Sequence, residues 1–209
     1  MQCPADGFGS AGPIFPGGAD QIIRCTRRAC PCGFSTCSRS SWDKGSGLMF
    51  IRELEERDDA AIASIIRQCL IEFGGNREGL AWADKSLDNL SGYYDAPGRK
   101  YWVIENEGTI EGGCGIAPFA DSNEVCELQK MYLLPGARGS GMAAKLMEAA
   151  LDFASVHYER CYLETLTSMK AAARFYEKHG FTGLEAPLEG SEHYACDAWY
   201  IKELQPLKS

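Results

Sequence analysis

The residues best suited to bind a charged ligand lie in a short turn, Arg138-Gly139-Ser140-Gly141. A strand-like run, residues 125–134, precedes the turn, and an amphipathic helix follows it. This order presents backbone N–H groups and the positive end of a helix dipole to an anion. The glycines let the main chain approach a phosphate closely, and Arg138 adds a permanent charge with forked donors. The pattern therefore predicts a diphosphate ligand.

Two other phosphate-binding patterns compete with this interpretation. A Walker-type loop requires Gly-x-x-x-x-Gly-Lys-Ser/Thr, a spacing that the sequence lacks, which argues against nucleoside triphosphate chemistry. A dinucleotide fingerprint fits better, because Gly139-x-Gly141-x-x-Ala144 matches its glycine pattern and Glu164 lies at a suitable distance for a ribose. In dinucleotide folds, however, the first glycine follows the strand almost directly, whereas a Pro-Gly-Ala-Arg linker intervenes here. A dinucleotide-dependent oxidoreductase is kept as an alternative.

Two motifs together resemble the GNAT superfamily of N-acetyltransferases. Residues 127–143 are similar to its coenzyme-A-binding motif, and residues 172–181, which contain Tyr176-x-x-x-Gly180-Phe181, are similar to its second signature. Their order and spacing make the resemblance specific, and it covers roughly residues 49–205. It implies an acyl-CoA N-acyltransferase fold with acetyl-CoA as co-substrate. A non-catalytic acyl-CoA sensor is a further alternative.

The resemblance also implies which residues hold acetyl-CoA. The main chain of Met131, Tyr132 and Leu133 would pair with the pantetheine arm, in a gap where this strand and the next one diverge. The pyrophosphate would lie on the turn and the start of the helix, at Arg138, Gly139, Ser140, Gly141, Met142 and Ala143. A plain strand-to-helix turn would explain the glycines equally well but leaves Arg138 without a role.

Acetyl transfer to a primary amine requires a deprotonated amine and a proton for the departing thiolate. Tyr176 matches a family tyrosine, which implies a general acid that also contacts the cofactor, although a tyrosine at helical spacing is otherwise a core residue. Glu127 interrupts an apolar strand, and we expect it to be the base, directly or through water, with Glu164 as second choice. A structural ion pair would explain Glu127 equally well. No metal is expected in the reaction.

The elements that position these residues indicate an α+β domain with a mixed, mostly antiparallel sheet flanked by helices. Helices are predicted from about residue 59 to Gly74-Gly75, near 86–93, after Gly141, and over 169–179. Strands are predicted near residues 50–54, 101–105, 109–117, 125–134, 160–166, 181–185 and 197–203. This order differs from the repeated βαβ units of a dinucleotide-binding fold.

Residues 1–48 differ in composition from the rest of the chain. They are rich in Gly, Pro, Ser and Cys and lack apolar periodicity, so we expect a disordered or non-native extension before an acetyltransferase domain at 49–209, with Met49 as a candidate native start. The spacing Cys25-x4-Cys30-x-Cys32-x4-Cys37 does not match the paired Cys-x2-Cys of zinc sites, so metal binding is the less favoured interpretation.

Composition limits the classes of partner. The chain has 209 residues and a net charge of −8, which argues against sequence-independent nucleic-acid binding and mildly favours a cationic acceptor. It contains no apolar run of the ~20 residues that cross a membrane and no apolar export segment, so a cytoplasmic protein without a membrane partner is expected.

The resemblance places the acceptor pocket between residues 73–94 and 189–194. Candidate lining residues there are Trp82, Tyr93, Tyr94 and His193. An amino acid, a polyamine, an antibiotic amine and a protein lysine all stay open as the amine. Similar proteins are commonly dimers, so a homodimer is compatible with the resemblance.

Overall fold

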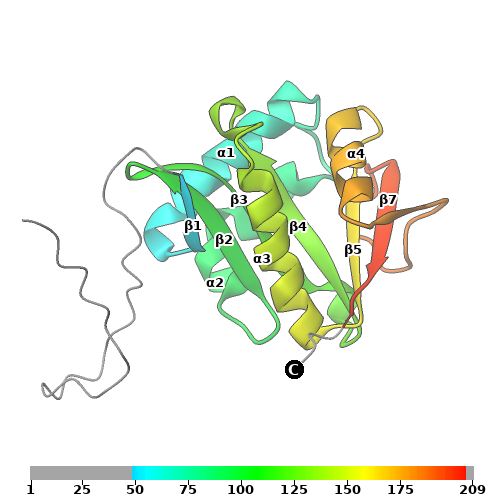
Figure 1. Cartoon of the computed structure of the whole chain (residues 1–209). Coiled ribbons are helices and arrows are strands. Elements are labelled where there is room, and N and C mark those ends of the chain that lie inside the picture. The colour runs from blue at the N-terminus through cyan, green and yellow to red at the C-terminus, as the bar shows by residue number, and fades with distance from the viewer. Residues whose placement is uncertain (1–48, 206–209) are drawn as a thin grey trace, which may run out of the picture. The chain divides into compact units, whose positions relative to one another are not determined.

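The computed structural model describes residues 49–205, which form a seven-stranded sheet with helices on both faces (Figure 1). The strands lie in the order β1-β2-β3-β4-β5-β7-β6. Their bounds are β1 Phe50–Glu53, β2 Lys100–Asn106, β3 Thr109–Pro118, β4 Val125–Leu133, β5 Arg160–Thr165, β6 Thr182–Leu184 and β7 Ala198–Glu203. Within these residues only β4 and β5 pair in parallel. The predicted mixed, mostly antiparallel α+β sheet is confirmed, and it is not the repeated βαβ order of a dinucleotide fold.

Two apolar clusters fill the opposite faces of the sheet. The helices are α1 Asp59–Glu72, α2 Leu90–Tyr94, α3 Met142–His157 and α4 Lys170–Lys178. α3 crosses the front of the sheet in Figure 1, and its apolar stripe packs with side chains of β2 to β5. α1 packs on the other face, against β3 and β4. Within residues 49–205 no helix is long and apolar enough to cross a membrane.

Helical periodicity explains the two long helices. The buried residues of α1 are Ile62, Ala63, Ile65, Ile66, Cys69 and Leu70. Those of α3 are Met142, Leu146, Met147, Ala150 and Ala154. In both helices these positions recur every three or four residues, so one stripe faces the sheet and is removed from water.

The helix predicted at residues 86–93 is interrupted. A short 3-10 helix, Lys85–Asp88, comes first, and α2 begins after Asn89. Asn89 has a φ of −155° and a ψ of 65°, and its side chain accepts a hydrogen bond from the Gly92 N–H. An asparagine that caps the next helix in this way leaves the helical conformation itself, which divides the predicted element.

A bulge interrupts the pairing of β3 with β4. Gly115 pairs with Gln129, whereas Gly113 pairs with Tyr132, so β4 holds one residue more than β3 over this interval. Lys130 lies in the interval with a φ of 51°, in the left-handed region that residues other than glycine seldom adopt. The extra residue bends the strand and changes the direction of the side chains beyond it.

The bulge reverses the alternation of β4. Before it, Cys126 and Leu128 pack in the α3 cluster; beyond it, Met131 and Leu133 do. In a regular strand of the same sequence, with no bulge, the side chains on the α3 face would all have even numbers. The α3 face therefore stays apolar along the strand, while polar residues on both sides of the bulge share the opposite face.

β4 and β5 separate soon after they begin. Their pairing joins Val125–Glu127 to Arg160–Tyr162 and goes no further. Residues 128–133 of β4 consequently have no partner residue in β5. The divergence of these two strands, which the family resemblance implied, is present in the structure.

Candidate active site

A cavity of about 390 Å³ lies beside the divergent end of β4. Residues 168–172, at the start of α4, line it together with Phe175. It is also lined by seven residues predicted to hold acetyl-CoA: Met131, Tyr132, Leu133, Arg138, Gly139, Ala143 and Tyr176. Because the main chain of β4 has no partner here on the side that faces β5, an extended ligand arm can pair with that edge as an added strand would.

The turn before α3 offers main-chain donors. Gly139 and Gly141 have φ values of 78° and 87°, and a Cβ at either position would meet nothing within 4 Å. The backbone conformation rather than crowding therefore requires glycine. In the described part of the chain no acceptor pairs with the N–H groups of Gly139, Gly141 or Ala143. Free N–H groups at a helix N-terminus suit an anion such as a pyrophosphate.

Two of the predicted pyrophosphate ligands have side chains with structural roles. The Ser140 hydroxyl donates to the Ala137 carbonyl at 2.6 Å and accepts from the Met142 N–H at 3.3 Å. The Met142 side chain is buried in the α3 cluster. Neither residue lines the cavity, so only their main-chain positions bear on a ligand there.

Arg138 is paired within the protein, in contrast to the free cation that the sequence suggested. Its guanidinium donates to the two carboxylate oxygens of Glu72 at 2.6 and 2.7 Å, and its Nε donates to the Leu133 carbonyl at 2.9 Å. The hydrogen bonds to Glu72 raise the pKa of Arg138. A pyrophosphate near Arg138 must replace Glu72 as its anion or bind at the free N–H groups beside it.

A larger cavity, of about 970 Å³, lies on the face of β4 that points away from α3. The segment 79–99 and the loop 190–194 between β6 and β7 enclose it. Tyr93 and His193 line it, as predicted. Tyr94 is buried and donates its hydroxyl to Gln129 Oε1 at 3.0 Å. Trp82 does not line this cavity; it packs against the α1 cluster.

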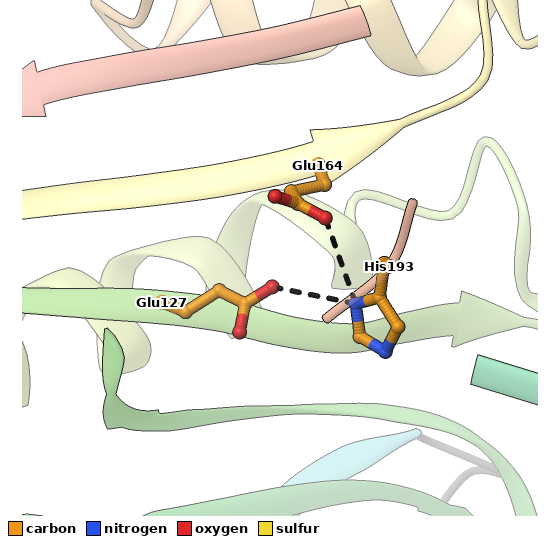
Figure 2. A group of neighbouring side chains, drawn as sticks. All are labelled: Glu127, Glu164 and His193. Atoms are coloured by element: carbon orange, nitrogen blue, oxygen red, sulfur yellow. Dashed lines mark ion pairs between the residues drawn. The ribbon is translucent and has the colours of Figure 1, made fainter. Parts of the chain in front are cut away.

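Glu127, Glu164 and His193 meet in this cavity (Figure 2). His193 Nδ1 lies 3.8 Å from Glu127 Oε1 and 3.7 Å from Glu164 Oε2. Both distances are longer than a hydrogen bond, so the three groups leave space between them. The other oxygens are fixed, because Glu127 Oε2 accepts from Gln129 at 2.7 Å and Glu164 Oε1 accepts from the Tyr162 hydroxyl at 2.8 Å.

Glu164 is a buried carboxylate with one unsatisfied oxygen. Its side chain is 2% exposed, and its Oε2 has no hydrogen-bond partner among residues 49–205. Burial raises the pKa of Glu164, although the hydrogen bond from the Tyr162 hydroxyl opposes the change. A carboxylate with a raised pKa takes up a proton closer to neutral pH, which is the property that a general base needs.

His193 is charged at neutral pH. Burial opposes its charge, but the carboxylates of Asp84 and Glu127 outweigh burial and raise the pKa of His193 to about 10. Its Nε2 lies 3.2 Å from Asp84 Oδ1, and Lys130 Nζ lies 2.6 Å from Asp84 Oδ2. Burial would raise the pKa of Asp84, yet these two cations lower it to about 2. Asp84 therefore stays ionised and holds His193 in place.

Tyr176 lies where the two cavities approach each other. A narrow cavity of about 60 Å³ is lined by Tyr132 and Tyr176 as well as by Glu127, Glu164 and His193. Burial raises the pKa of Tyr176, so its hydroxyl is protonated at neutral pH and is a weaker acid than an exposed tyrosine; it can donate a hydrogen bond to a developing thiolate.

The same cluster has the donor set of a metal site. One ligand atom each from Glu127, Glu164 and His193 lies within 4.8 Å of the other two, a combination that zinc accepts. Metal binding requires a neutral imidazole, and while no ion is bound the neighbouring carboxylates raise the pKa of His193 to about 10, which opposes loss of its proton. The imidazolium already balances part of the negative charge, and the remainder suits the ammonium group of a substrate.

Sequence analysis missed Asp84, Arg99, Gln129 and Lys130, all of which line the larger cavity. The run Glu127-x-Gln129-Lys130 was a usable signal, since three polar residues within an apolar strand are unusual in a core. Asp84 and Arg99 lie in irregular segments, and neither belongs to a recognisable motif.

Comparison with known proteins identifies the family. Residues 97–183 match the family model described as the Acetyltransferase (GNAT) domain. The chain is 43% identical over 157 residues to the uncharacterized N-acetyltransferase YjgM of Escherichia coli K12, which covers 74% of this chain and 94% of YjgM. It is 34% identical over 103 residues to human N-acetylaspartate synthetase, which covers 49% of this chain and 32% of that protein.

Solved structures share the fold. The structure of yncA from Salmonella typhimurium, described as a putative acetyltransferase with its cofactor acetyl-CoA, has a TM-score of 0.60 at 20% identity, over 78% of this chain and 97% of that one. At this identity the likeness concerns the fold alone. The match to nearly the whole of YjgM goes further, and together with the family model it shows that the chain belongs to the GNAT family of acetyl-CoA-dependent N-acetyltransferases.

Proposed function

We propose that the protein transfers the acetyl group of acetyl-CoA directly to a primary amine held between Glu127 and Glu164. The observation that carries the proposal is the narrow cavity that Tyr176 and these two carboxylates line together. A thioester beside Tyr176 would present its carbonyl carbon to an amine at the carboxylates. Holding both reactants in this way removes much of the entropic part of the barrier.

The two carboxylates have different tasks in this proposal. An amine arrives as an ammonium ion, which Glu127 and Glu164 attract, and it must lose a proton before it can attack. The free Oε2 and raised pKa of Glu164 support Glu164 as the proton acceptor, directly or through a water molecule. Glu127, whose Oε2 accepts a hydrogen bond from Gln129, then orients the amine. The family motif favours the reverse assignment, with Glu127 as the base, and the test below separates the two.

Tyr176 supplies the proton for the leaving group. As the amine nitrogen bonds to the carbonyl carbon, the carbon–sulfur bond breaks and the Tyr176 hydroxyl protonates the departing thiolate. After the attack the nitrogen still carries one proton more than the amide product, and it loses this proton to the carboxylates Glu127 and Glu164. Tyr176 is reprotonated from solvent. The products are an N-acetyl amide, coenzyme A with a free thiol, and one proton.

The test measures thiol release from acetyl-CoA with a panel of primary amines. If Glu164 is the base, Glu164→Gln lowers kcat on the order of 100-fold and removes the acidic limb of the pH–rate profile. Glu127→Gln then mainly raises KM for the amine. Glu124→Gln is the matched control, because Glu124 is exposed and pairs only with Arg160. Loss of the acidic limb in Glu127→Gln alone would assign the base to Glu127, and unchanged rates in both variants would overturn the proposal.

The sensor alternative predicts a different result. A calorimetric titration would then show binding of acetyl-CoA, while no amine in the panel would be acetylated. The proposal assigns both cavities, and hence binding and turnover, to the domain at residues 49–209.

A further inference from the structure

The larger cavity, which contains Glu127 and Glu164 and is called the acceptor cavity from here on, is lined by charges of both signs, although the whole chain has a net charge of −8. Its acidic lining residues are Asp84, Asp121, Glu127, Glu164 and Glu192. Its basic ones are Lys85, Arg99, Lys130 and His193. Net charge favours a purely cationic acceptor, whereas local charges of both signs suit a molecule that carries both.

The basic groups differ in whether a carboxylate already neutralises them. Lys130 and His193 both lie against Asp84. Arg99, in contrast, has no carboxylate at ion-pair distance among residues 49–205. Its guanidinium carbon lies 4.4 Å from the centre of the Tyr93 ring, and Nη1 donates to the Tyr93 carbonyl at 3.3 Å.

Arg99 has donors to spare for a ligand. A guanidinium offers five N–H donors in a fork that matches a carboxylate, and one hydrogen bond is made here. Arg52 and Arg138 show the usual alternative, since each pairs with a protein carboxylate at 2.6 Å. Arg99 is half-buried and lines the cavity, so a carboxylate entering the cavity can reach it.

A row of contacts connects the catalytic carboxylates to Arg99. Glu127 accepts from Gln129 at 2.7 Å, and the Tyr93 hydroxyl lies 3.4 Å from Gln129 Oε1. Arg99 lies over the ring of the same tyrosine. The wall of the cavity therefore runs from an anionic end at Glu127 and Glu164, along Gln129 and Tyr93, to a cationic end at Arg99.

We propose that the acceptor is an amine that also carries a carboxylate, with its amino group at Glu127 and Glu164 and its carboxylate on Arg99. This inference rests on the proposed function and specifies its substrate class. The opposite charges of the acceptor then match the two ends of the wall, and Arg99 makes the charge-assisted, forked hydrogen bonds that it lacks in the free protein.

Matched pairs of acceptors test the inference, since the members of each pair differ by one carboxylate. Suitable pairs are β-alanine with ethylamine, 4-aminobutyrate with propylamine, and lysine with cadaverine. We expect kcat/KM to be at least about 10-fold higher for the carboxylated member of the preferred pair, the effect of a hydrogen bond to a charged group. The chain length of the preferred pair reports the separation of the two ends of the wall.

Variants at Arg99 connect this preference to the residue. Arg99→Gln should lower kcat/KM for the carboxylated member on the order of 10- to 100-fold, mainly through KM. It should leave kcat/KM for the partner without a carboxylate, and the KM for acetyl-CoA, within about two-fold of wild type. Arg99→Lys keeps a positive charge and should recover part of the loss. Arg57→Gln is the matched control, because Arg57 is exposed and pairs with Glu55 away from the cavity.

The outcomes separate this inference from the proposed function. If ethylamine, propylamine and cadaverine react as well as their carboxylated partners in the wild type, the inference is wrong and acetyl transfer stands. That comparison needs no variant, so it holds even if Arg99→Gln fails to fold. Equal losses for both members of a pair in Arg99→Gln would also overturn the inference, because they would indicate a structural role. A panel in which no amine is acetylated would overturn the proposed function itself.

Discussion

Raising the pH should remove one positive charge from the active site and destabilise the protein. His193 lies 3.2 Å from an oxygen of Asp84 and 3.7 Å from one of Glu164, and its side chain is 18% exposed. Its pKa is raised from 6.5 to about 10, so the folded protein holds this proton more tightly than the unfolded chain does. The resulting stabilisation is fully present below pH 6.5 and is lost as the pH rises through 10.

The size of the effect follows from the shift. The rise in the pKa of His193 from 6.5 to about 10 corresponds to about 5 kcal/mol, at ~1.36 kcal/mol for a tenfold change in proton affinity. Solvent reaches part of the side chain and screens its interaction with the neighbouring carboxylates. We therefore expect about 2 kcal/mol of the free energy of unfolding to depend on this charge.

Urea denaturation of the wild type and of His193→Gln at pH 6, 8 and 10 measures this difference. Glutamine keeps a hydrogen-bonding side chain of similar length but never carries a charge. The wild type should be more stable by about 2 kcal/mol at pH 6, and the difference should shrink steadily toward pH 10. Titration of residues remote from His193 affects both proteins alike and cancels in the comparison, whereas Asp84 and Glu164, whose charged forms His193 favours, contribute to the difference. A difference that does not change with pH would refute a charged His193 in the folded protein.

Three further predictions concern the donor side and metals. Tyr176→Phe should lower kcat on the order of 100-fold while leaving the dissociation constant of acetyl-CoA nearly unchanged, as a stopped assay and calorimetry together would show; equal rates would make Tyr176 a packing residue. Arg138→Ala should weaken acetyl-CoA binding about 10-fold, whereas Glu72→Gln should tighten it because it frees Arg138. If calorimetry shows the same acetyl-CoA affinity in both variants as in the wild type, Arg138 is excluded from the pyrophosphate site. Dialysis against EDTA should leave turnover intact, since protonated His193 is a poor metal ligand, and activity that zinc alone restores would contradict this.

The fold could be predicted from the sequence because its signals are local. The glycine turn at residues 139–141, the apolar stripe of the following helix and the strand before it lie within one continuous stretch. The second helix at Tyr176 is equally compact. Residues with these periodicities have few ways to bury their apolar faces, so the α+β arrangement follows from them. The main local error, at Asn89, arose where a capping side chain overrode helical spacing.

The site was less predictable because its pairings join distant segments. Glu127 and Glu164 could be singled out as carboxylates in apolar strands, but their shared partner His193 lies in an irregular loop. The pairing of Arg138 with Glu72 joins residues 66 positions apart, and that of Lys130 with Asp84 depends on a bulge. The spacing of residues in the sequence does not predict such contacts, because they depend on how the folded sheet bends.

In the proposed reaction, the reversal at Lys130 separates two kinds of recognition along one strand. Beyond residue 130, β4 would meet the donor through its backbone, which is the same for almost any side chain. Before it, the strand would meet the acceptor through the side chains of Glu127 and Gln129. On this proposal, substitutions at 127–130 can change the preferred amine without changing the backbone that holds acetyl-CoA. Deletion of Lys130 would restore the regular alternation of β4 with Met131 and Leu133 still on the α3 face, and it would remove the cation that pairs with Asp84.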